Sequence, residues 1–149
     1  MKSSVISARV VVGCDGTPAS DAALRFAVEE ARLRHARLIV VAAYYRPIDP
    51  DIDTFDIPDS VLRERVWEHT AMCLGRALDA PSDSAGTPEI VTGSGDPAEL
   101  LLLHAADAVM LVIGSHHRPF LQRLLTHLTS GELLRDSPVP VTMVPGVWT

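Results

Sequence analysis

The sequence predicts an α/β fold in which one doubly wound, five-stranded parallel sheet carries helices on both faces. Short apolar runs alternate along the chain with longer amphipathic segments, which is the order of elements typical of a parallel sheet. The runs are apolar at successive positions rather than at every second one, as in strands buried on both faces. The chain of 149 residues is long enough for one core and too short for two, so we expect a single domain over residues 1–149.

Apolar runs place the strands, and capping residues place the helices. Thr17 can cap the first helix, and Pro18 suits its first position because the N–H that proline lacks would have no helical partner there. The expected strands cover residues 8–14, 38–45, about 88–92, 108–114 and 140–144. The expected helices cover residues 18 to about 35, residues 59–80, a segment that begins at Asp96-Pro97, and about 130–136.

The last strand has the features of a sheet edge. Proline flanks it at Pro140 and Pro145, and proline is tolerated at edges because it cannot donate a ladder hydrogen bond. Val139, Val141 and Met143 alternate along it, and an uncovered apolar edge favours pairing with a second copy. We therefore expect a homodimer formed through this strand.

Charge and composition exclude some classes of partner and indicate a cellular compartment. The net charge of −6 repels a phosphate backbone, and the arginines near residues 32–37 share their stretch with glutamates, so we expect no nucleic-acid partner. No apolar stretch reaches the roughly 18 residues of a membrane span. Residues 1–7 do not resemble a signal peptide. A cytoplasmic protein with no membrane association is the expectation, and any protein partner is unknown.

The two cysteines, Cys14 and Cys73, lie far apart in the sequence and lack the spacing of metal ligands. Cys14 falls inside an apolar run, which favours a reduced, buried thiol.

The predicted topology places a ligand crevice between Asp15 and Gly114. In open parallel sheets, ligands lie beyond the carboxyl ends of the strands, at the point where the strand order reverses. If the first and fourth strands are central neighbours, that point falls between Asp15, after the first strand, and Gly114, which ends the fourth. Asp15 has two interpretations of equal weight: a pocket residue, or a residue that stabilises the Asp15-Gly16 turn.

Four segments in register carry a family resemblance. They are VVVGCDGTPAS near the start, Gly95-Asp96-Pro97-Ala98-Glu99, the stretch from Gly114-Ser115-His116-His117 to His127-Leu128-Thr129-Ser130, and Ser137-Pro138-Val139-Pro140-Val141. Together they resemble the universal stress protein family over nearly the whole chain. The resemblance implies a fold like that of the adenine nucleotide alpha hydrolases, a homodimer through the last strand, and an Asp at position 15 that lines a nucleotide pocket.

Nucleotide-binding members of that family carry glycine, two residues, glycine, nine residues, then glycine followed by Ser or Thr. Glycine there permits positive φ and lets backbone N–H groups approach phosphate oxygens. In this chain the four positions hold Gly114, His117, His127 and Leu128, so three of the four depart from the pattern. A histidine in a left-handed conformation costs roughly 1 kcal/mol relative to glycine, and Leu128 lacks the hydroxyl.

Other residues of the same segment bear on the choice between two functions. Thr129 and Glu132 match a capping box, which would place a carboxylate near the helix end that a triphosphate would approach. These departures favour a regulatory stress-response module without catalysis and without a bound cofactor. The alternative is a switch that binds ATP or another adenine nucleotide, with slow or no hydrolysis, because the segment also offers positive charge. Its candidate binding residues are Asp15, Gly114, Ser115, His117, Arg118, His127, Thr129 and Ser130.

The other sequence motifs are weaker evidence for a binding site or an enzyme activity. The Gly93–Ala98 stretch fits a dinucleotide fingerprint, but it follows the third strand, and the next strand does not end on an acidic residue. The aspartates at 49–56 lack the glycine and closing glutamate of a calcium loop, and the adjacent His116-His117 pair is more simply explained as part of a polar loop than as a metal site. No Walker A sequence or nucleophile elbow occurs, so we expect no catalytic residue and no metal.

Overall fold

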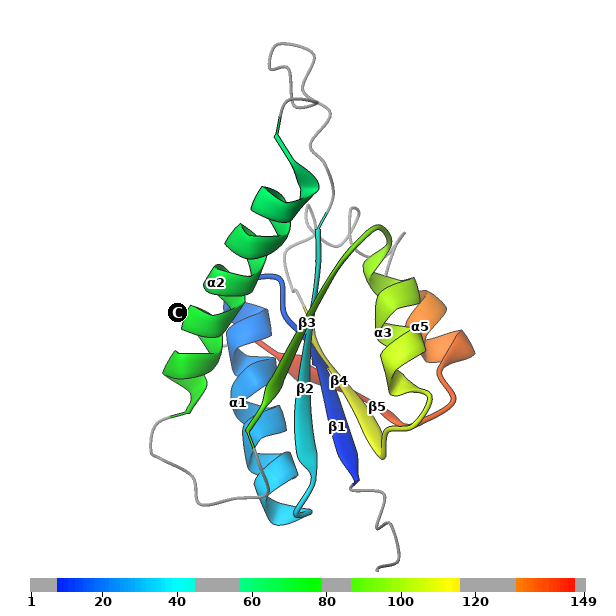
Figure 1. Cartoon of the computed structure of the whole chain (residues 1–149). Coiled ribbons are helices and arrows are strands. Elements are labelled where there is room, and N and C mark those ends of the chain that lie inside the picture. The colour runs from blue at the N-terminus through cyan, green and yellow to red at the C-terminus, as the bar shows by residue number, and fades with distance from the viewer. Residues whose placement is uncertain (1–7, 45–56, 79–86, 116–130, 147–149) are drawn as a thin grey trace, which may run out of the picture.

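The computed structural model describes residues 8–44, 57–78, 87–115 and 131–146, which form a five-stranded parallel sheet with helices on both faces (Figure 1). The strands are β1 (Arg9–Gly13), β2 (Arg37–Tyr44), β3 (Glu89–Ser94), β4 (Met110–Ser115) and β5 (Val141–Pro145). The helices are α1 (Pro18–Leu33), α2 (Asp59–Ala77), α3 (Pro97–Ala105) and α5 (Gly131–Asp136). The predicted alternation of strands and helices is therefore confirmed, with shifts of a few residues at the boundaries.

The order of strands across the sheet is β3-β2-β1-β4-β5. β1 pairs with β2 on one side and with β4 on the other, so the predicted central pair of first and fourth strands is confirmed. β5 pairs with β4 and lies at the edge, as its prolines predict. The strand order reverses between β1 and β4, and ligands of such sheets bind beyond the carboxyl ends of the two strands at this point.

The central strands are buried on both faces because helices cover each side. Val10 and Val12 point into one cluster beneath α1 and α2, whereas Val11 points into a second cluster beneath α3 and α5. All three valines are completely buried. Figure 1 shows the two helix layers, with α1 and α2 on one side of the sheet and α3 and α5 on the other. Continuous apolar runs are thus the consequence of a two-sided core.

Helix α1 begins where the sequence predicts. The Thr17 hydroxyl accepts a hydrogen bond from the Ser20 N–H at 3.3 Å, and Pro18 follows at the first helical position. Its buried stripe consists mainly of small side chains, which allows the helix to lie close to the sheet. The buried residues of this helix are Ala19, Ser20, Ala23, Leu24, Ala27 and Ala31.

Candidate functional site

The candidate site lies at the carboxyl edge of the sheet, where β1 and β4 end side by side. Val12 of β1 is paired with Val112 of β4, so the chain leaves the same edge of the sheet after β1, which ends at Gly13, and after β4, which ends at Ser115. The predicted residues Asp15, Gly114 and Ser115 therefore come to the same edge. The predicted residues His117, Arg118, His127, Thr129 and Ser130 lie outside the described residues, as does the side chain of Glu132.

Asp15 stabilises the turn that joins β1 to α1. Its Oδ1 atom accepts hydrogen bonds from the Thr17 N–H at 3.0 Å and from the Thr17 hydroxyl at 2.6 Å, and its own N–H donates to Ser20 Oγ at 3.1 Å. Gly16 completes the turn with a φ of 80°, a conformation that favours glycine. The interpretation of Asp15 as a turn residue is confirmed by these bonds.

Gly114 is required by packing at this edge. A Cβ atom on Gly114 would lie 2.5 Å from the carbonyl oxygen and 2.6 Å from the carbonyl carbon of Ala19, near the start of α1. These are backbone atoms, so a side chain at 114 would push the helix away from the strand. The absence of a Cβ at Gly114 is thus explained by contact between β4 and α1, independently of any phosphate.

Two further loops complete the described part of the edge. Asp96 caps α3, because its Oδ1 accepts a hydrogen bond from the Ala98 N–H at 3.1 Å. The preceding Gly95 N–H donates to the Tyr44 carbonyl oxygen at 3.1 Å, which joins the ends of β3 and β2. The Asp96-Pro97 helix start, which also formed part of the dinucleotide fingerprint, is therefore an ordinary N-cap followed by proline.

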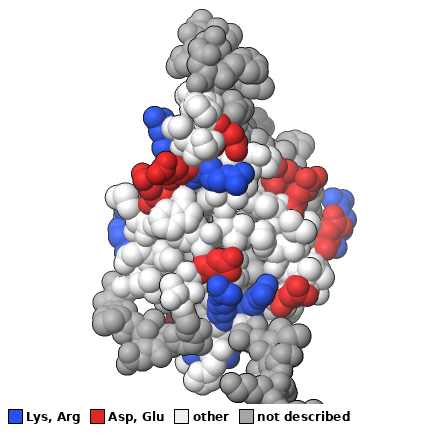
Figure 2. All heavy atoms as spheres, in the orientation of Figure 1, with Lys and Arg blue, Asp and Glu red and all other residues white. Residues whose placement is uncertain are grey.

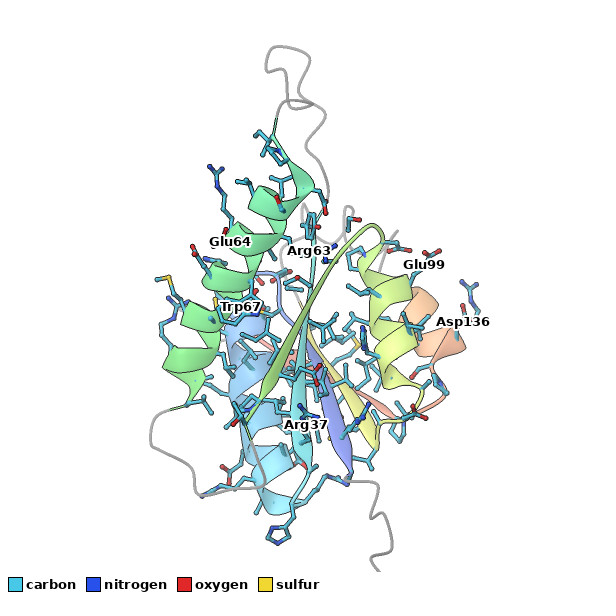
Figure 3. All side chains as sticks on the ribbon, viewed as in Figure 1. Arg37, Arg63, Glu64, Trp67, Glu99 and Asp136 are labelled. Atoms are coloured by element: carbon cyan, nitrogen blue, oxygen red, sulfur yellow. The ribbon has the colours of Figure 1, made fainter. Side chains whose placement is uncertain are left out.

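A polar network that the sequence does not predict lies at the end of β2. The Tyr44 hydroxyl donates to Asp59 Oδ1 at 2.9 Å and accepts from Arg63 Nε at 3.4 Å, and Arg63 Nη2 lies 3.6 Å from Asp59 Oδ2. The Tyr44 hydroxyl and the Asp59 carboxylate raise the pKa of Arg63. Figure 3 shows Arg63 extending from α2 above the sheet. The sequence holds two signs of this network. Tyr44 lies at the end of an apolar run, and the first turns of the next helix carry an acidic and a basic residue four positions apart.

Charges of both signs are interspersed on the face shown in Figure 2. Arg32 of α1 lies 2.5 Å from Glu29, and Arg34, which follows this helix, lies 2.9 Å from Glu30. Arg37 of β2 pairs instead with Glu89 of β3, at 3.2 Å. Among the described residues, no group of three or more His, Cys, Asp or Glu side chains is arranged to hold a metal ion. Within the same residues, no helix has the length and apolar character to cross a membrane.

Comparisons with known proteins identify relatives of this sequence. The sequence matches the universal stress protein family over residues 7–145. It is 33% identical to universal stress protein Rv2623 of Mycobacterium tuberculosis over 159 aligned residues, which include 97% of this chain and 50% of that protein. It is 30% identical to universal stress protein Rv2005c of the same organism, over 90% of this chain and 44% of that protein. The chain thus spans about half the length of the curated relatives it matches.

Solved structures show the same fold. A universal stress protein family structure from Burkholderia pseudomallei is 27% identical, with a TM-score of 0.63 over 97% of this chain and 100% of that one. A universal stress protein in complex with cAMP is 24% identical, with a TM-score of 0.66 over 92% of this chain and 95% of that one. The protein from Archaeoglobus fulgidus in complex with dAMP is 21% identical, with a TM-score of 0.59 over 94% of this chain and 99% of that one.

Proposed function

Because the chain belongs to the universal stress protein family, we propose that it is a regulatory stress-response module that acts without catalysis and does not hold ATP in its crevice. The crevice between β1 and β4 is where a nucleotide would enter such a fold. The proposal rests on what the described residues offer at that place, and on how the sequence departs from the family's glycine pattern.

The observation that carries the proposal is that the N-termini of helices α1 and α3, at this edge, are already capped by side chains. At α1, the Thr17 and Ser20 N–H groups donate to the side chains of Asp15 and Thr17. At α3, the Ala98 N–H donates to Asp96. An anion binds to a helix N-terminus through such amides, so their capture by the chain's own side chains leaves fewer donors for phosphate.

The charges at the same edge oppose a polyphosphate. Asp15, Asp59 and Asp96 each place a carboxylate near the end of a strand, after β1, beside Tyr44 of β2, and after β3. The Arg63 guanidinium on this side is engaged with Asp59 and Tyr44. A triphosphate would therefore meet like charges here. In the family's glycine pattern, the phosphate-binding amides belong to the segment that begins at Gly114. That segment holds His117, His127 and Leu128 in place of the expected glycines and hydroxyl.

A thermal-shift series tests the proposal. We expect Tm to stay unchanged with millimolar ATP, ADP, AMP and cAMP, each with Mg²⁺, and we expect no release of phosphate from ATP above a protein-free blank. A ligand present at about 100 times its Kd adds roughly 2.7 kcal/mol to the free energy of unfolding, which would raise Tm by several degrees. Such a rise with ATP, or steady phosphate release that follows the protein through purification, would overturn the proposal.

The second candidate is a switch that binds a less highly charged adenine nucleotide. Solved relatives are described as complexes with cAMP and dAMP. Each of these ligands carries one phosphate, which the carboxylates at this edge oppose less strongly than three. A Tm rise with AMP or cAMP but not with ATP would support this candidate, and no rise with either nucleotide would remove it.

We also propose a homodimer through β5. Among the described strands, β5 pairs on one side only, with β4, and Met143 on it is 41% exposed. A lysine at Met143 would place a charge on the edge, and charges on edge strands block pairing. We expect light scattering to give a dimer for the unaltered chain and a monomer for Met143→Lys. Leu103→Lys, at an exposed position on α3, is the matched control and should remain dimeric. A monomeric unaltered chain at micromolar concentration would contradict the proposal.

A further inference from the structure

The two cysteines of the chain lie in one buried cluster, on the face of the sheet that α1 and α2 cover. Cys14 directly follows β1 and holds its place by donating its N–H to the Val41 carbonyl oxygen at 2.9 Å. Cys73 lies on α2. Both side chains are buried in the same cluster, between the sheet and the helices α1 and α2, and both thiols are free. The fold has therefore brought into one cluster two residues that lie far apart in the sequence.

Neighbouring contacts fix the position of Cys73 against this turn. His69 lies one helical turn before Cys73, with its Nε2 atom 3.9 Å from the Cys73 sulfur. The same Nε2 atom would lie 2.6 Å from a Cβ added to Gly16, so this stretch of α2 faces the segment from Cys14 to Gly16. Arg76 donates from Nη2 to the Cys73 sulfur at 3.3 Å and lies 3.7 Å from Asp21 of α1. These contacts hold α2 against α1 and the turn.

The electrostatics of Cys73 agree with this placement. Burial raises the pKa of the Cys73 thiol most strongly, the Cys14 thiol and Asp21 raise it further, and Arg76 opposes them. The part that Cys14 plays in raising this pKa agrees with the position of the two thiols in one buried cluster. A raised pKa keeps the thiol protonated near neutral pH, so its oxidation is slow there.

We propose that Cys14 and Cys73 are an oxidisable thiol pair that peroxide converts to an intramolecular disulfide. One thiolate attacks a peroxide oxygen, the O–O bond breaks, and the released hydroxide takes up a proton to become water. The second sulfur then displaces the hydroxyl from the sulfenic acid, the S–S bond forms, and a second water leaves with the remaining thiol proton. Two thiols and one hydrogen peroxide thus give one disulfide and two waters.

The disulfide would join α2 covalently to the turn that carries Asp15. It closes the chain between Cys14 and Cys73, so it restrains the β1–α1 turn, the whole of α1 and the first part of α2 relative to one another. This inference does not depend on which ligand, if any, the crevice binds. Its failure would leave the proposed function untouched, and the converse also holds.

Peptide mapping of the full chain after treatment with hydrogen peroxide tests the pair. We expect the mass to fall by two hydrogen atoms, a peptide that links Cys14 to Cys73 to appear, and dithiothreitol to reverse both changes. The chain contains only these two cysteines, so Cys14→Ala and Cys73→Ala each leave a single thiol and serve as matched controls. Each control should lose the intramolecular link and proceed instead to sulfinic acid or to a disulfide between chains.

The pH dependence gives a second readout. Oxidation should accelerate about tenfold per pH unit on the alkaline side of neutrality, and the rate should level off at a higher pH than in the urea-unfolded chain, because the fold raises the pKa of Cys73. Two results would overturn the proposal. One is that both thiols survive peroxide that oxidises the unfolded chain. The other is that the native chain oxidises at the rate of the single-cysteine variants with no linked peptide.

Discussion

The triple variant His117→Gly, His127→Gly and Leu128→Ser is expected to bind ATP about 100-fold more tightly than the unaltered chain. It restores the spacing of three glycines and a hydroxyl that nucleotide-binding members of the family carry, beginning at Gly114. Each restored glycine removes a penalty of roughly 1 kcal/mol for a left-handed conformation, and the hydroxyl adds about 1 kcal/mol through a hydrogen bond. Together these contributions give about two orders of magnitude in Kd, measured by equilibrium dialysis.

The matched control is His116→Gly, which removes a neighbouring imidazole outside the pattern. It should leave the affinity for ATP within about twofold of the unaltered chain, since none of the terms above changes. A triple variant that binds no more tightly than this control would show that the glycine pattern is not what limits binding. The carboxylates of Asp15, Asp59 and Asp96 would then be the dominant obstacle.

Gly114→Ala is expected to lower the free energy of unfolding by about 3 kcal/mol. The new Cβ would lie 2.5 Å from the Ala19 carbonyl oxygen and 3.0 Å from the Ser20 backbone nitrogen. Because these are backbone atoms, no side-chain rotation relieves the contact, and α1 must move away from β4. Urea denaturation followed by circular dichroism measures the loss as a lower midpoint with little change in m.

Gly75→Ala is the matched control for this change. Gly75 lies inside α2, and a Cβ added there would meet nothing within 4 Å. Alanine should therefore raise stability by about 0.5–1 kcal/mol, through its better helix propensity. If Gly114→Ala were as stable as the unaltered chain, the close packing of β4 against α1 would be contradicted. If it were destabilised as expected, the glycine at 114 would be accounted for without a nucleotide.

Much of the fold follows from local pattern. The valines of β1 lie in an unbroken apolar run because helices cover both faces of the strand, and this run alone indicates a central strand. The cap at Thr17 and the proline at Pro18 mark the start of α1 through interactions between near neighbours in the chain. The prolines of β5 mark an edge because of the hydrogen bond that proline cannot donate. Each of these features can be recognised in a stretch of only a few residues.

The contacts that shape the candidate site do not follow from local pattern. Tyr44 meets Asp59 and Arg63 only because α2 folds back over the end of β2. Cys14 and Cys73 lie in the same buried cluster for a related reason, since α2 packs beside α1 against the sheet. Asp15 is ambiguous in the sequence for another reason. An aspartate that stabilises the turn and an aspartate that lines a pocket would both stand at this position, so the residue type does not separate the two roles. The hydrogen bonds to Thr17 were needed to establish the first role.

The most direct measurement of the central claim is a calorimetric titration of ATP with Mg²⁺ into the unaltered full chain, at an ionic strength near physiological. The capped helices α1 and α3, the carboxylates of this edge and the altered glycine positions together predict no saturable heat, or a Kd of about 1 mM or weaker. A saturable isotherm with one site per chain and a micromolar Kd would contradict the claim and establish that the crevice binds ATP.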